Sequence, residues 1–113
     1  MIFLAGFASP LLAEEVDLEL VLAMDASGSI SNSEYVLQLD GTSAAFQHPE
    51  IQAAISSGPI GKIAVIVMLW SDAAFPKINS GWFLLDGPQS ANAFAAMVRN
   101  FQLTEDQIGR AHV

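Results

Sequence analysis

Three oxygen-bearing side chains, Asp25, Ser27 and Ser29, stand at alternate positions directly after an apolar run, in the stretch MDASGSIS. A turn at Gly28 can fold one carboxylate and two hydroxyl oxygens toward a common point. Such hard oxygen ligands suit Mg²⁺, Mn²⁺ or Ca²⁺ and suit zinc poorly. Mg²⁺ wants six oxygens and keeps some water, so three protein ligands make part of a site. The spacing predicts a partial site for a hard divalent cation.

Two other interpretations of these residues stay open on the pattern alone. In the simpler one, the stretch is a strand-to-helix turn whose serines only cap backbone N–H groups. In the other, Asp25 is the phosphoryl acceptor of an α/β enzyme that handles phosphate. Phosphatases of that kind usually carry a second aspartate two residues further on, whereas this chain has Ser27 there. The enzymatic interpretation is therefore the weakest of the three.

The elements that flank this turn follow from apolar patterning. Leu18 to Met24 is an apolar run of strand length and predicts a buried strand. Ser31 and Glu34 have the spacing of a capping box, which predicts a helix that ends near His48, before a proline. We interpret Gly41, a weak helix former, as a position that allows close approach to a sheet. The inward face of this helix should carry Val36, Leu39, Ser43 and Phe46.

The second half of the chain predicts two more strands and a helix. Ile63 to Trp70 is rich in β-branched residues and should be a central strand covered on both faces. A loop over residues 71–81 leads to a short strand, Trp82 to Leu85, and Ala91 to Phe101 should be helical. The fold class is α/β, in the order strand, helix, strand, strand, helix, the first half of a doubly wound, mostly parallel sheet. Ligands bind beyond the carboxyl ends of such strands, where Asp25 lies.

Composition narrows the function classes. The chain has 113 residues, enough for one small domain, with 52% hydrophobic and 14% charged residues, which is typical of a core-forming globular sequence. Its net charge of −8 repels nucleic acid and anionic membranes and favours cations or basic partners. Because it contains no cysteine, thiolate metal sites and cysteine nucleophiles are excluded.

Both ends of the chain differ in character from its middle. Residues 1–13, MIFLAGFASPLLA, have the apolar run and small residues of part of a secretory signal peptide, with cleavage after Ala13, and are too short to span a bilayer. Residues 108–113, IGRAHV, look like the translation of a sequencing adapter, so we expect a non-native tail after an artificial truncation. The domain should occupy residues 14–107.

The succession of motifs resembles a von Willebrand factor type A (VWA) domain, in a bacterial secreted subgroup of unknown function. The resemblance covers about residues 16–101 and is carried by VDLELVLAMDASGSIS, EYVLQLDG, GPIGKIAVIVMLWS and LLDGPQSANAFAAM. It implies that Asp25, Ser27 and Ser29 belong to a metal-ion-dependent adhesion site. It also implies a threonine and an aspartate from later loops. Neither is assigned here, since Thr104 lacks the surrounding pattern of the family.

The resemblance implies a secreted or periplasmic, metal-dependent protein-binding module and not an enzyme. Its cation, Mg²⁺ or alternatively Mn²⁺ or Ca²⁺, would take an Asp or Glu carboxylate from a protein partner. Neither nucleic acid nor stable membrane insertion of the mature chain is expected.

Other conspicuous residues receive no functional role. Asp72 is interpreted as a solvated loop acid, and His48 and His112 as isolated histidines without a catalytic or metal partner. Trp70, Trp82 and the phenylalanines have strand or helix spacing, which predicts core positions.

Overall fold

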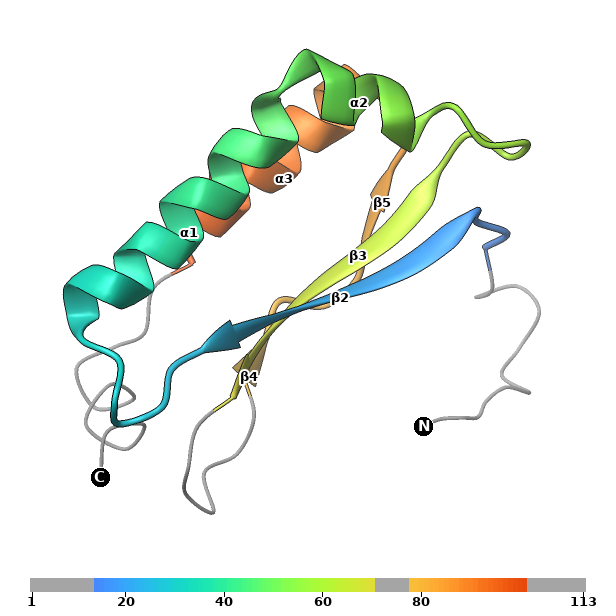
Figure 1. The fold of residues 1–113 in the computed structure, drawn as a ribbon. Helices are drawn as coiled ribbons and strands as arrows, with labels where there is room; N and C mark the ends of the chain where they lie inside the picture. The colour runs from blue at the N-terminus through green and yellow to red at the C-terminus, as the bar shows by residue number, and fades with distance from the viewer. Residues whose placement is uncertain (1–13, 71–77, 102–113) are drawn as a thin grey trace, which may run out of the picture.

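The structure is a computed structural model that describes residues 14–70 and 78–101 (Figure 1). Its elements in chain order are β2 (Leu18–Asp25), α1 (Asn32–Gln47), α2 (Pro49–Ile55), β3 (Ile63–Trp70), β4 (Ile78–Asn79), β5 (Phe83–Leu85) and α3 (Pro88–Arg99). The predicted order of strand, helix, strand, strand, helix is confirmed. Two short elements add to it, namely α2 and the two-residue strand β4, which lies where we predicted a loop.

The sheet is built around β3. On one side, β2 pairs with it in parallel over eight residue pairs, from Leu18 with Ile63 to Asp25 with Trp70. On the other side, β4 and β5 pair with it in antiparallel fashion near its two ends. The helices α1 and α3 lie side by side over one face of this sheet (Figure 1). The predicted α/β class with a mostly parallel sheet is confirmed, and the arrangement is compatible with part of a Rossmann-like fold.

The core lies between this helical layer and the sheet. Val65, Val67 and Leu69 alternate along β3 and point at the helices, and none is more than 2% exposed. Phe94 of α3 is fully buried and makes edge-to-face ring contacts with Phe46 of α1 and with Phe83, at centroid distances of 4.8 and 5.5 Å. This ring cluster joins α1, α3 and β5.

Helix α1 begins where the sequence predicts and turns a different face inward. Its N-cap is Ser31, with the predicted capping box, and its last residue is Gln47. Val36 was predicted on the inner face, but it is 40% exposed, and Tyr35 is buried instead, because Tyr35 lies one helical turn (four residues) before Leu39. Gly41 does not approach the sheet, since a methyl group added there would meet no atom within 4 Å.

Two predictions of burial are wrong, because the described helices cover one face of the sheet. β2 was predicted to be buried, yet Leu18 and Val21 are half exposed, since the strand lies at the sheet edge. β3 was predicted to be covered on both faces, but Ala64 and Met68, which point away from the helices, are only partly buried.

The tryptophans are likewise not core residues. Trp70 alternates with buried Leu69, so it faces away from the helices and is 42% exposed, while Trp82, just before β5, is 55% exposed. The core placement holds for Phe46 and Phe94.

Several predictions fall on residues that the structure does not describe. These are the signal segment 1–13, the tail 108–113, Asp72, Thr104 and His112. Within residues 14–70 and 78–101, no helix combines the length and the hydropathy needed to cross a membrane.

Candidate metal site

The candidate site begins at the carboxyl end of the parallel pair. β2 runs to Asp25, and the next residue, Ala26, still donates its N–H to the carbonyl of Trp70 at 2.9 Å. The chain then turns, with Ala26 and Ser27 both buried, and enters α1 at its N-cap. Parallel pairing thus places the predicted turn at the sheet edge where α/β proteins bind ligands.

Hydrogen bonds hold the three predicted ligands in one turn. The backbone N–H of Ser27 donates to Oδ1 of Asp25 at 2.9 Å, and the N–H of Ile30 donates to the carbonyl of Ser27 at 3.0 Å. The hydroxyl oxygens of Ser27 and Ser29 lie 3.2 Å apart. Within the described residues, no hydrogen bond engages Oδ2 of Asp25. The turn therefore gathers two hydroxyls beside a carboxylate with one oxygen available.

The spacing of the two hydroxyls fits a shared cation. Oxygens bound to Mg²⁺ at about 2.1 Å in an octahedron stand about 3.0 Å apart when they occupy adjacent positions. For Ca²⁺, with bonds of about 2.3–2.6 Å, the same separation is about 3.3–3.7 Å. The 3.2 Å between Ser27 Oγ and Ser29 Oγ lies between these values. The hydroxyl pair can therefore occupy adjacent coordination positions of a hard divalent cation with little movement.

The acid closest along the chain after the turn has a different role. Oε1 of Glu34 accepts the N–H of Ser31 at 2.8 Å, and the N–H of Glu34 donates to Oγ of Ser31 at 3.1 Å. The hydrogen bond from the Ser31 backbone, followed by that from its hydroxyl, lowers the pKa of Glu34 below its usual value. This carboxylate is engaged in capping α1 and fixes the far end of the turn.

The sequence gave no warning of one further contact to the turn, made by Gln38 on α1. Its Oε1 accepts the backbone N–H of Asp25 at 3.0 Å, and its Nε2 donates to the backbone carbonyl of Asp25 at 2.8 Å. The two residues lie 13 positions apart, so no local spacing rule finds this pair. The only sequence signal is a polar residue next to buried Leu39 on the helix that follows β2.

The described residues hold no group of three or more His, Cys, Asp or Glu side chains placed to bind a metal. The candidate site rests on one carboxylate and two hydroxyls, a set suited to hard cations. His48, predicted to have no catalytic or metal role, caps α2 by accepting the N–H of Glu50 on Nδ1 at 3.1 Å.

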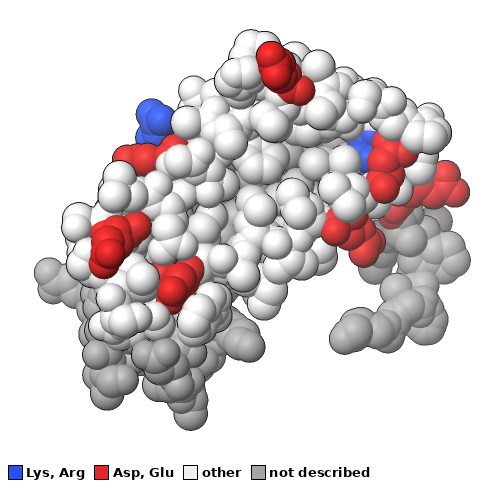
Figure 2. Space-filling view, in the orientation of Figure 1, with Lys and Arg blue, Asp and Glu red and all other residues white. Residues whose placement is uncertain are grey.

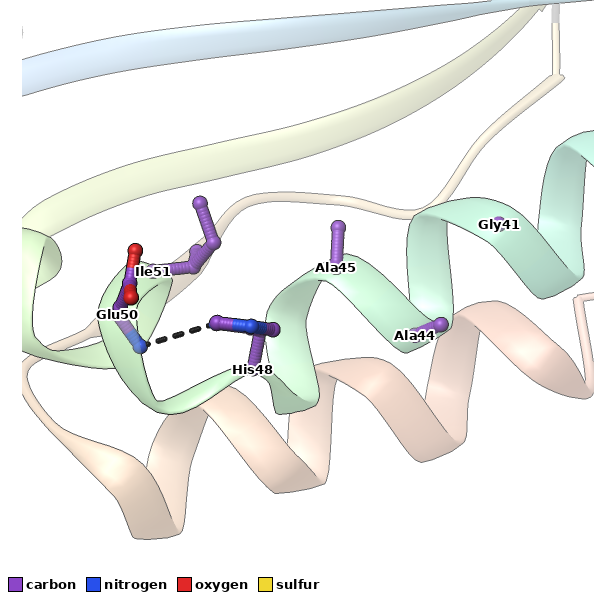
Figure 3. A pocket seen from close by; sticks show the side chains of 6 residues that line it. All are labelled: Gly41, Ala44, Ala45, His48, Glu50 and Ile51. Carbon is purple, nitrogen blue, oxygen red and sulfur yellow. Dashed lines mark hydrogen bonds between the residues drawn. The ribbon is translucent and has the colours of Figure 1, made fainter.

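Two shallow hollows lie along α1. One, of about 460 Å³, follows β2 and is lined by Val21, Leu22, Ala23, Met24, Leu37, Gln38, Gly41 and Thr42. The other, of about 450 Å³, is shown in Figure 3 and is lined by Gly41, Ala44, Ala45, His48, Glu50 and Ile51. In the second hollow, the ring nitrogen of His48 already bonds Glu50, and the other lining side chains are mostly small or apolar. This hollow offers no convergent polar groups for a ligand.

The surface around these features is acidic. Acidic side chains are spread over the face shown in Figure 2, where basic ones are few. This agrees with the net charge of −8 for the whole chain and raises the local concentration of cations.

Fold and turn together define a class of protein: an α/β domain in which a parallel strand pair ends in a turn with candidate ligands for a hard cation. The chain belongs to the family described as protein of unknown function (DUF1194), which it matches over residues 15–111. Comparison with curated proteins gave no match, and comparison with solved structures gave none either.

Proposed function

We propose that this chain is a VWA-like, metal-dependent protein-binding module. The observation that carries the proposal is the turn in which the hydroxyls of Ser27 and Ser29 lie 3.2 Å apart beside Asp25, at the carboxyl end of a parallel pair. A turn that served only to cap backbone groups would have no need to bring two hydroxyls to the spacing of adjacent metal ligands.

Each of the three residues has a distinct task in this proposal. Asp25 supplies the single negative charge, while its Oδ1 also orders the turn through the N–H of Ser27. Ser27 is buried and presents its hydroxyl from a fixed position, and Ser29 is exposed and completes the pair. Bound Mg²⁺, Mn²⁺ or Ca²⁺ would supply a positive charge for the Asp or Glu carboxylate of a partner protein.

The low ligand charge makes a carboxylate partner chemically reasonable. One carboxylate and two neutral hydroxyls leave a divalent cation with a net positive charge, which favours an anionic oxygen as a further ligand. The surrounding acidic surface would repel a strongly acidic partner, so the partner carboxylate should sit on a neutral or basic surface. Nucleic acid is not a partner in this proposal, and the mature chain acts outside the cytoplasm, secreted or periplasmic, without stable membrane insertion.

Calorimetric titration with Mn²⁺ and Mg²⁺ tests the proposal. Asp25→Ala should abolish binding, whereas Ser27→Ala and Ser29→Ala should weaken it, because only Asp25 carries charge. Asp40→Ala is the matched control, since it removes an exposed acid of α1 outside the turn and should leave the affinity unchanged.

Equal metal affinity in the wild type and Asp25→Ala would overturn the proposed site. The phosphoryl-acceptor alternative has its own outcome: a trapped phosphoenzyme labelled at Asp25 in the presence of Mg²⁺ would replace the binding module with an enzyme.

A further inference from the structure

The carboxyl end of β2 has a free side that Gln38 occupies. Ala26 donates its N–H to Trp70 of β3, and the direction of backbone groups alternates along a strand. The N–H and C=O of Asp25 therefore point away from β3, toward the side where β2 has no strand neighbour among the described residues. There the amide of Gln38 binds both groups, at 3.0 and 2.8 Å.

We propose that Gln38 is a positioning residue for the candidate metal site, an inference that rests on the proposed function. Its side-chain amide imitates the peptide group of a neighbouring strand, accepting from the N–H and donating to the C=O of the same residue. That residue is the only charged member of the predicted ligand set. Gln38 thereby fixes the backbone from which the Asp25 carboxylate projects.

The same helix anchors the turn at both ends. The capping box of Ser31 and Glu34 fixes the end of the turn at the first residues of α1. Gln38, in the second turn of the helix, fixes the beginning of the turn at Asp25. Between these anchors lie Ser27 and Ser29, whose hydroxyls must keep their separation to share a cation. The spacing of the ligands is thus set by a rigid helix, which is how outer contacts tune a metal site.

An amide is the one side-chain group that suits this position at neutral pH. A leucine of similar size keeps the packing and loses both hydrogen bonds. A glutamate at position 38 still accepts the N–H of Asp25, but when ionised it cannot donate to the carbonyl, and its negative charge faces that carbonyl oxygen. The two substitutions therefore separate the contribution of shape from that of hydrogen bonding.

The test uses the full chain and measures two independent quantities. Residue-resolved hydrogen exchange reports the protection of the Asp25 amide, and calorimetry with Mn²⁺ reports the metal affinity. In Gln38→Leu we expect the Asp25 amide to exchange about tenfold faster or more. The Mn²⁺ affinity should fall about tenfold, as for the loss of an outer-shell contact.

Gln38→Glu should restore part of the amide protection, because the acceptor remains. The control is Gln47→Leu, which changes a glutamine of the same helix that bonds the hydroxyl of Ser43 and does not contact the turn. It should leave both the Asp25 amide and the metal affinity unchanged.

The two readouts distinguish failure of this inference from failure of the proposed function. Unchanged exchange at Asp25 in Gln38→Leu would overturn the role of Gln38, as would an unchanged Mn²⁺ affinity in a protein whose wild type binds the ion. A wild type that binds no Mn²⁺ would overturn both the metal module and a role of Gln38 in it. Faster Asp25 exchange together with weaker Mn²⁺ binding, both absent from Gln47→Leu, supports the inference.

Discussion

Replacing Gly41 with alanine should stabilise the protein. Gly41 lies inside α1, and the added methyl group would meet no atom within 4 Å, so the substitution creates no clash. Alanine loses less backbone entropy than glycine on forming a helix, which is worth about 0.5–1 kcal/mol. For a domain of about 100 residues this corresponds to a rise in Tm of roughly 2–8 °C.

Gly58→Ala is the matched control with the opposite sign. A methyl group at position 58 would lie 2.5 Å from the carboxyl carbon of Asp17, which accepts the backbone N–H groups of Ile60, Gly61 and Lys62. Because the clash must displace Asp17 from these bonds, Tm should fall.

Thermal unfolding followed by circular dichroism, at one protein concentration for all variants, compares them directly. A lower Tm for Gly41→Ala than for the wild type would refute the reasoning, because it would mean that an atom outside the described contacts occupies the space at Gly41.

Three further predictions concern the core, the pH dependence and the sheet edge. Phe94→Ala should cost about 3–5 kcal/mol in denaturant unfolding, because it empties a fully buried site between two other rings; a loss below about 1 kcal/mol would contradict the ring cluster. The N–H groups of residues 60–62, that of Ile60 first, lower the pKa of Asp17 below 3.8, so this carboxylate stabilises the fold above that pH and the stabilisation is lost as the pH falls through the lowered pKa. The Tm advantage of the wild type over Asp17→Asn should therefore shrink in acid, and parallel Tm curves would refute this. The chain should self-associate through the free edge of β2 in size-exclusion chromatography, and Val21→Lys should reduce this association, whereas a monodisperse wild-type monomer would speak against it.

The strands and helix starts were predictable because their signals are local. The run Ile63–Trp70 is β3 residue for residue, and the spacing of Ser31 and Glu34 marked the true start of α1. Exposure was less predictable, because an apolar run does not say which of its faces another element will cover. For this reason the sequence misplaced Trp70 and Trp82 in the core.

The candidate site was predictable in the same local sense. Alternate spacing after a strand end located Asp25, Ser27 and Ser29, and the structure brings them into one turn. Gln38 was missed because its partner is the backbone of a residue 13 positions earlier, and a backbone group leaves no mark in the sequence. Contacts of this kind depend on how a helix is set against a strand, which becomes known only when the fold is known.

The register of the parallel pair also has a kinetic consequence. Each of its residue pairs joins positions 45 apart, from Leu18 with Ile63 to Asp25 with Trp70. Closing a loop of that length costs about 3 kcal/mol of chain entropy beyond a constant term, and it must occur before the strand contacts repay it. The helices α1 and α2 lie within the loop and can form earlier from local contacts, so docking of β2 onto β3 should be the slow step of folding. Until that step, the apolar run of β2 has a strand neighbour on neither side, and newly made chains are most exposed to aggregation during this interval.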